Sequence, residues 1–260
     1  MKRLFVCVFI QLASMLFILG CGEPRRVDGS KAQNRNGVLY IVNEETPYTG
    51  ILYSEYPNGQ LKVESFYKAG KAEGLQKSWH ENGQLESEST FSAGQPMEKQ
   101  KVWYETGQLL RESVFEDGKL NGACKIWHKN GQLKEEVFFD KGKREGKSQT
   151  WYENGKLKIE RFFKNDKLDG VCRMWFENGQ IQDEMHYKDD KGDGPFKVWY
   201  ENGQLSKEGS FKDDKEDGNV KYWDENGKPI TLSEHVDIDC AKILRKEETN
   251  NSAEPTHNIE

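Results

Sequence analysis

The sequence lacks several features that large classes of protein need. Only 35% of its 260 residues are hydrophobic, against 32% charged and 12% aromatic, so aliphatic side chains are too scarce for a thick core. A basic excess is also missing. The formal net charge is −6, and losing residues 1–20 removes Lys2 and Arg3 but no acid, which leaves −8. An acidic chain is a poor ligand for nucleic acid, so we expect no nucleic-acid partner.

The chain has one long apolar run, and it lies at the N-terminus. Lys2 and Arg3 precede residues 4–19, which are apolar but too short and too N-terminal for a comfortable membrane-spanning helix. This pattern is typical of an export signal that is cleaved off. The sequence therefore predicts a signal peptide over residues 1–20.

A cysteine follows the apolar run directly. Ile18-Leu19-Gly20-Cys21 resembles the bacterial lipobox, in which the Cys is lipidated and becomes the new N-terminus. The resemblance implies that Cys21 is a lipid anchor, for example through palmitate, and that the protein lies in the cell envelope. Gly22 resembles the residue of lipoproteins that are sorted to an outer membrane, where the host has one. Residues 21–45 are polar and without apolar periodicity, and we expect a flexible tether there.

The rest of the chain repeats with a period of 24 residues. Asn-Gly recurs at Asn58, Asn82, Asn130, Asn154, Asn178, Asn202 and Asn226, with Thr106-Gly107 in the one gap. All seven Trp residues share the period: Trp79, Trp103, Trp127, Trp151, Trp175, Trp199 and Trp223. A column of Phe or Tyr and a column of Glu follow it too. We therefore predict a repeat array over residues 46–228.

Each repeat contains two turn signals half a period apart. Asn-Gly between β-formers predicts a two-residue type I′ hairpin, because that turn needs positive φ at both central residues. The second signal is rich in Gly, Asn and Asp, as in residues 117–122. Two strands per repeat predict an all-β fold: an elongated antiparallel meander of about sixteen strands and on the order of 75 Å at ~4.8 Å per strand.

The predicted turn sets the register. With Asn82-Gly83 as the loop, Trp79 faces Glu86 and Lys77 faces Glu88. The same count pairs a base or Gln with Glu in five more repeats, which makes the Glu column structural rather than catalytic. By alternation, the Trp column and the Lys/Glu pairs share one face, where indole can make cation–π contact with Lys or Arg. The Phe column and the aliphatic residues line the other face.

These residues resemble a known family. The unit Trp-Tyr-Glu-Asn-Gly-Gln-Leu, followed by Glu, an aromatic and Asp-Gly-Lys-x-x-Gly, approximately as in residues 151–170, is similar to the MORN repeat variant of bacterial proteins. The resemblance implies an elongated antiparallel sheet that serves as a scaffold, a membrane-associated platform or a binding surface. Some bacterial members are labelled antitoxin-like. Glu98 departs from the pattern, because the other repeats have Gly there, and we expect a local distortion around residues 92–100.

No constellation of residues predicts catalysis, a metal site or a cofactor. The acids recur with the period and have basic partners. His80 and His128 replace the aromatic residue that follows Trp elsewhere, and they are ~19 Å apart, beyond shared metal ligation. Cys124 and Cys172 are separated by the same spacing, so we expect free, buried thiols instead of a disulfide.

The period ends before the C-terminus. Residues 229–246 are predicted to form a last strand and a short helix that cap the open edge of the sheet. Residues 247–260 have the composition of a disordered tail.

Three functions remain open at this point. The favoured one is a non-enzymatic envelope-anchored scaffold that binds a protein or polymer partner through many equivalent shallow sites, with the seven Trp as the candidate surface. The second is carbohydrate or cell-wall binding, because a Trp/Tyr ladder can stack on sugar rings. The third is antitoxin-like binding to a protein, against which an export signal argues.

Overall fold

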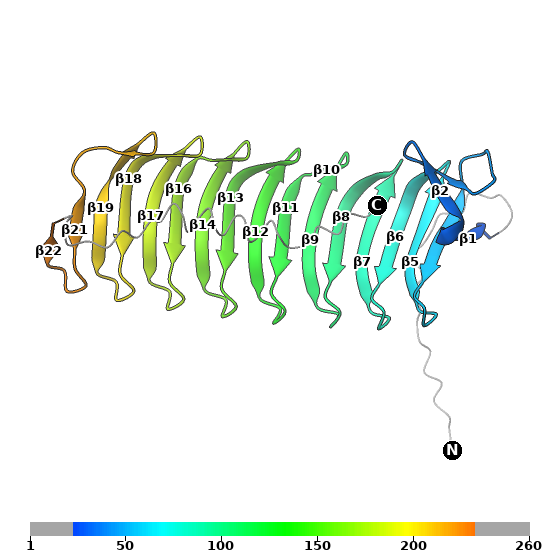
Figure 1. Cartoon of the computed structure of the whole chain (residues 1–260), viewed down its shortest axis with the longest axis horizontal. Helices are drawn as coiled ribbons and strands as arrows, with labels where there is room; N and C mark the ends of the chain where they lie inside the picture. Colours follow the sequence, from blue (N-terminus) through cyan, green and yellow to red (C-terminus); the bar gives the residue numbers. More distant parts are fainter. Residues whose placement is uncertain (1–22, 232–260) are drawn as a thin grey trace, which may run out of the picture.

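The computed structural model describes residues 23–231, and these form an almost entirely β-strand molecule. Figure 1 shows a single layer of strands side by side along the long axis. The one helical element among the described residues is a 3-10 turn, η1 (Gly29–Lys31). The predicted elongated, antiparallel β-meander is therefore confirmed.

The array follows chain order from β4 to β22, and neighbouring strands are antiparallel. Its strands are β4 (Gly50–Glu55), β5 (Leu61–Lys68), β6 (Lys71–Trp79), β7 (Leu85–Ser92), β8 (Gln95–Trp103), β9 (Leu109–Glu116), β10 (Lys119–Leu120), β11 (Gly122–Trp127), β12 (Leu133–Asp140), β13 (Lys143–Trp151), β14 (Leu157–Lys164), β15 (Lys167–Leu168), β16 (Gly170–Trp175), β17 (Ile181–Lys188), β18 (Lys191–Trp199), β19 (Leu205–Lys212), β20 (Lys215–Glu216), β21 (Lys221–Trp223) and β22 (Pro229–Ile230). The pairs β10/β11, β15/β16 and β20/β21 are each one interrupted strand. Counted so, the array has the sixteen strands that the repeat predicts.

The Asn-Gly turns have a different geometry from the predicted one. Gly83 has φ +84°, but Asn82 is not among the residues with positive φ. The backbone N–H of Gly83 donates to the carbonyl of His80, and the N–H of His80 donates to the carbonyl of Gln84, both at 2.8 Å. This is a three-residue loop: a type I turn followed by a glycine in a G1 bulge. The predicted two-residue type I′ turn at Asn-Gly is wrong.

The type I′ turns lie at the opposite edge of the sheet instead. Ala69 and Gly70 have φ +49° and +76° and form a two-residue loop between the paired residues Lys68 and Lys71. The same turn geometry recurs in every later repeat. In the last three of these turns, Asp or Asn occupies both loop positions, as at Asp189 (φ +52°) and Asp190 (φ +69°). Asn and Asp tolerate this region better than other L-residues, because their short side chains can hydrogen-bond locally.

The register away from the turns is as predicted. Lys77 pairs with Glu88, and the other predicted pairs form at the same position: Lys101 with Glu112, Lys125 with Glu136, Gln149 with Glu160, Arg173 with Glu184, and Lys197 with Glu208. The longer loop shifts the pairing nearest the turn, so Trp79 lies opposite Leu85 and not opposite Glu86. The shift recurs as a β-bulge at the other Asn-Gly turns except the last, where Trp223 pairs with Pro229 and Tyr222 with Ile230 in regular register.

The distortion expected around residues 92–100 is small: the register shift between β7 and β8 lies between Glu88 and Thr90, one residue earlier than at the equivalent position of β5 and β6. Strand β8 is continuous, and Glu98 pairs with Phe115 as Gly74 pairs with Phe91. Glu98 keeps the left-handed backbone of the glycine it replaces, with φ +57°. Such a backbone costs an ordinary L-residue roughly 1–2 kcal/mol. The fold therefore tolerates a strained residue here instead of changing shape.

The N-terminal segment is folded and is not a flexible tether over its described part. Strand β1 (Arg26–Asp28) pairs in parallel with β4, and β2 (Ala32–Arg35) forms a hairpin with β3 (Val38–Ile41). Val27, Ile41 and Tyr48 are buried together. The prediction failed because this burial comes from tertiary contacts, which leave no periodic pattern in the sequence.

Two bonds dock this segment onto the first type I′ turn. The N–H of Leu39 donates to the carbonyl of Gly70 at 2.8 Å, and the N–H of Gly70 donates to the carbonyl of Tyr48 at 2.7 Å. The Tyr48 hydroxyl donates to backbone carbonyls on both sides, at Arg25 and Ile51. The segment thus caps the first edge of the array, which would otherwise expose unpaired backbone groups.

One face of the sheet carries the buried side chains. We call it the core face, and its largest clusters are Ile159, Cys172 and Met174 on β14 and β16, and Met185, Phe196 and Val198 on β17 and β18. Toward the N-terminus the equivalent positions are small or polar, as at Ser65, Gln76, Ser89 and Ser113. The core is therefore thin, as the composition predicts.

The last described strand is β22, which pairs with β21. The predicted final strand of the C-terminal cap begins here, at Pro229. The remainder of the predicted cap, and the predicted tail over residues 247–260, lie outside the described residues.

Candidate functional site

The seven Trp residues form a column on the face opposite the core face. Lys77 and Trp79 are two residues apart on a regular strand, so they point to the same side. We call this side the Trp face. Each of the seven indoles is half-buried, at the same register position of its repeat. The structure therefore brings the whole predicted set together on one surface.

Exposed apolar side chains lie beside this column. Leu75, two residues before Lys77, is 48% exposed, and Phe138, two residues after Glu136, is 39% exposed. By strand alternation both belong to the Trp face. Large exposed apolar groups next to half-buried aromatics are typical of interaction surfaces.

Ion pairs run along the Trp face next to the indoles. Lys77–Glu88 is 3.3 Å, Lys125–Glu136 is 3.1 Å and Arg173–Glu184 is 2.7 Å. Gln149, the uncharged exception, donates to Glu160 at 2.8 Å. Partly exposed pairs such as these add little stability each. They fix register and neutralise charge, so the surface beside the Trp column is close to neutral.

The indoles take no part in the predicted cation–π contacts. Among the described residues, Lys and Arg lie over Tyr and Phe rings, such as Lys158 over Tyr152 at 5.5 Å and Arg144 over Phe163 at 4.1 Å. The Tyr is the residue after Trp and therefore points to the other face. The prediction placed the cations on the wrong ring, because it could not distinguish two neighbouring aromatics.

A ladder of hydrogen bonds fixes the spacing of the Trp column. At this register position, a Tyr donates to the backbone carbonyl of the Trp that lies 23 residues further on, at 2.7–2.9 Å: Tyr56 to Trp79, Tyr104 to Trp127, Tyr152 to Trp175 and Tyr200 to Trp223. Phe176, at the same position, has no hydroxyl to donate. His80 and His128 make the same contact through Nε2 at 2.9 Å. Because a carbonyl only accepts, Nε2 carries the proton in both. The two histidines are thus structural substitutes for Tyr, as predicted.

The Asn-Gly turns form a second ladder. The Asn82 carboxamide accepts from the N–H of Gln84 at 2.9 Å and donates to the carbonyl of Glu105 in the next turn at 2.8 Å. Five other repeats make the equivalent contact to the next turn. The Asn is therefore selected for its two-sided side chain, and sequence reasoning missed this because the acceptor lies in another repeat.

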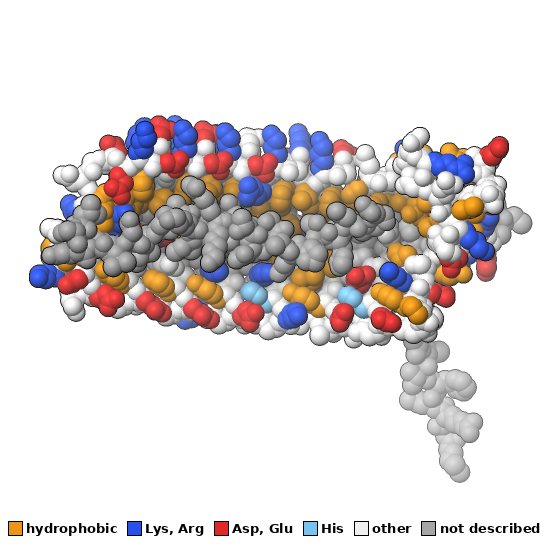
Figure 2. All heavy atoms as spheres, viewed as in Figure 1, with side chains coloured by type: hydrophobic (Ala, Val, Ile, Leu, Met, Phe, Trp, Pro, Cys, Tyr) orange, Lys and Arg blue, Asp and Glu red, His pale blue; other side chains and the backbone are white. Residues whose placement is uncertain are grey.

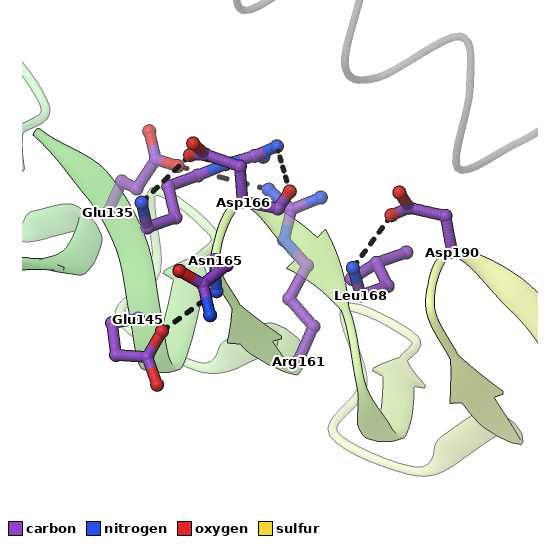
Figure 3. Close-up of polar contacts among 8 residues, drawn as sticks. Glu135, Glu145, Arg161, Asn165, Asp166, Leu168 and Asp190 are labelled. Atoms are coloured by element: carbon purple, nitrogen blue, oxygen red, sulfur yellow. Dashed lines mark hydrogen bonds and ion pairs between the residues drawn. The ribbon is translucent and has the colours of Figure 1, made fainter.

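The type I′ edge has its own inter-repeat contacts (Figure 3). The Asp190 carboxylate accepts from the backbone N–H of Leu168 at 2.7 Å, and Asp166 accepts from that of Arg144 at 2.8 Å. The N–H of Asn165 donates to Glu145 at 2.8 Å. Charged side chains of both signs gather along this edge in Figure 2. These acids have structural partners, so the edge is not a metal-binding cluster.

The core face carries a few charged residues among its apolar ones. Arg161 is 7% exposed and lies 3.9 Å from Glu135, and Asp183 is 1% exposed. Lys207 is half-buried on β19, 3.1 Å from the carboxylate of Glu216 and 5.1 Å from the Phe196 ring. A buried charge needs a partner, and these charged groups have partners within the protein. The core face therefore carries polar as well as apolar groups.

The cysteines and histidines offer no site for chemistry. Cys124 and Cys172 are not in a disulfide, as predicted. Burial raises the pKa of the Cys124 thiol, which makes it less nucleophilic. Among residues 23–231, no group of three or more His, Cys, Asp or Glu side chains could hold a metal ion. Within the same range, no helix is long and apolar enough to cross a membrane. The predicted lipid anchor, Cys21, lies outside the described residues.

The chain was compared with known proteins. A family model described as MORN repeat variant matches eight segments, which together make up more than half of the chain. They are residues 48–69, 72–93, 99–117, 120–141, 144–165, 168–189, 192–213 and 216–237. No curated protein matches it.

Proposed function

We propose that this chain, which belongs to the MORN repeat variant family, is a non-enzymatic scaffold that binds a protein or polymer partner on its Trp face. A lipid on Cys21 holds it at the cell envelope. MORN repeats are in general protein- or membrane-interaction repeats. The observation that carries the proposal is the row of half-buried indoles at one register position per repeat.

Two features suit this row to binding. Trp supplies a large contact area at a low cost in side-chain entropy, and it is enriched among the residues that dominate binding energy. The inter-repeat ladder holds the indoles at a constant spacing, so little order has to be gained on binding. Several weak contacts at fixed spacing then add up to avidity for a repetitive or extended partner.

Quenching of Trp fluorescence tests the binding surface directly, because all seven Trp lie in the array. The full chain is titrated with acrylamide alone, then with peptidoglycan, envelope polysaccharide or solubilised envelope proteins. We expect the protein fraction to protect the indoles. Protection by polysaccharide alone would favour carbohydrate binding, and quenching that no fraction changes would reject the Trp face as the binding surface.

Substitution identifies which contacts matter. Trp127→Ala with Trp151→Ala should weaken binding of the protecting fraction by at least about tenfold, the scale expected for interface Trp residues. Lys215→Ala, on an exposed residue at the type I′ edge, is the control and should leave affinity unchanged. Equal affinity of the wild type, the double Trp variant and the Lys215→Ala variant would contradict the proposal.

The anchor requires a separate test. Cells that express the chain are fed a labelled fatty acid and are then separated into membrane and soluble fractions. We expect label on the wild-type chain in the membrane fraction, and an unlabelled, soluble Cys21→Ala variant. Label that persists in the Cys21→Ala variant would place the lipid elsewhere.

A further inference from the structure

The core face is buried although the sheet is a single layer. Figure 1 shows no second layer of described strands over it, and Figure 2 shows a band of apolar side chains along the long axis between two charged edges. Cys172, Met174 and Phe196 of the core face are 1%, 3% and 2% exposed. An apolar face of this length needs a cover.

The floor of the core face also holds polar groups that need partners. Ser89 is 3% exposed, Ser148 is fully buried at 0% and Thr150 is 8% exposed. Their hydroxyl oxygens make no hydrogen bond to any described residue. A buried hydroxyl without a partner costs about 1–3 kcal/mol. The cover therefore has polar groups of its own, as a polypeptide does.

Charges on the core face alternate in sign. From the C-terminal end inward they are Lys207 on β19, Asp183 on β17 and Arg161 on β14. Successive members are two strands apart, so the three span ~19 Å. Any segment lying along the face in this direction meets a positive, a negative and a positive group in turn.

The residues that follow Thr231 have the complementary order. The acids Glu234, Asp237 and Asp239 come first, the bases Lys242, Arg245 and Lys246 come next, and the acids Glu247 and Glu248 follow. Asp239 and Glu247 are eight residues apart, which reaches up to ~26 Å in an extended chain. Apolar residues are interleaved with the charges, among them Val236, Ile238 and Cys240.

The connection also has the right place and length. The described chain ends next to β22, and β22 lies two strands from β19, so the segment starts beside Lys207. We infer that residues 232–248 dock along the core face of their own chain, with Asp237 and Asp239 near Lys207 and the following bases near Asp183. The C-terminal segment is then the missing second layer. This docking uses the face opposite the proposed binding surface and does not depend on it.

Alkylation of Cys240 tests the docking in the full chain, because peptide mapping by mass spectrometry reads it apart from Cys124 and Cys172. We expect the Cys240 thiol to react with iodoacetamide at least about tenfold more slowly than in a synthetic peptide of residues 232–260. Lys207→Glu should remove most of this protection. Lys207→Glu combined with Asp237→Lys and Asp239→Lys should restore it.

The controls separate docking from general damage and from dimerisation. Lys215→Glu reverses an exposed charge on the neighbouring strand β20 and should leave Cys240 protected. Reaction of wild-type Cys240 as fast as in the peptide would overturn the inference. So would protection that grows with protein concentration, because the cover would then come from a second copy, and so would failure of the charge swap to restore protection.

Discussion

The phenol oxygen of Tyr152 donates a hydrogen bond of 2.7 Å to the backbone carbonyl of Trp175, 23 residues further along the chain. This bond joins two repeats and not two strands of one hairpin. It reaches the point where the β-bulge disturbs the strand ladder, between Met174 and Trp175. A Tyr or His side chain makes this contact to the next repeat at six positions, which accounts for the Tyr or His found there.

Removing one of these hydrogen bonds between repeats should lower the stability of the array, and adding one should raise it. Tyr152→Phe should lower the free energy of unfolding by about 1 kcal/mol, a fall in Tm of about 2–4 °C, because a half-buried carbonyl loses its donor. Phe176 occupies the same position in the next repeat without a hydroxyl, so Phe176→Tyr should raise stability by a similar or smaller amount. Thermal unfolding followed by circular dichroism measures both. Two shifts of the same sign would show that the bond does not stabilise the array.

Glu98 is expected to be a removable source of strain. Its φ is +57°, and it is exposed, so Glu98→Gly should stabilise the chain by about 1 kcal/mol. Gly146 is the matched control, because its φ is +78° and nothing lies within 4 Å of the position of a Cβ there. Gly146→Glu should therefore destabilise by a similar amount. Urea unfolding of both variants measures the difference, and a destabilised Glu98→Gly variant would contradict the assignment of strain.

The period and the register were predictable because they depend on local rules. Alternation and the count from the turn place Lys77 opposite Glu88, and the structure agrees. The turn type was not predictable. Asn-Gly suits a type I′ turn and also a three-residue loop with Gly in the bulge, and in the loop that forms here the Asn82 carboxamide reaches the carbonyl of Glu105. That acceptor is adjacent only after the repeats have stacked.

The sequence predicts which residues lie on the Trp face but not the contacts that they make. Alternation places Trp79 beside Lys77, but it does not show that the cations bind Tyr rings on the other face. The folded N-terminal segment was missed for a similar reason. Val27 and Tyr48 are isolated apolar residues in a polar stretch, and only their burial against Ile41 and the first repeat explains them.

The N-terminal segment should loosen at low pH. Arg25 donates two hydrogen bonds to Glu44, which lower the pKa of the Glu44 carboxyl. A carboxyl whose pKa is lower in the folded state than in the unfolded state stabilises the fold at pH values above its unfolded pKa, which is about 4.3. This contribution is lost as the pH falls through the pKa of the folded state. The pair is exposed, so the effect is small. Amide exchange in β2 and β3, corrected for intrinsic rates, should become faster when the pH is lowered from 6 to 3. This increase should be larger in the wild type than in the Glu44→Gln variant. Glu45→Gln should behave as wild type.

Gly70 should matter more than its counterparts in other type I′ turns. Its φ of +76° resembles the +83° of Gly94, so backbone strain from Ala costs both about the same, roughly 1 kcal/mol. A Cβ on Gly70 would also collide with Val38 and the backbone of Leu39, whereas on Gly94 the nearest atom is 3.8 Å away. Gly70→Ala should therefore undock the β2–β3 hairpin and speed protease cleavage between Ala32 and Ile41, with little change in the array. Gly94→Ala should leave that cleavage unchanged, and equal cleavage of the two variants would show that Gly70 does not hold the N-terminal cap.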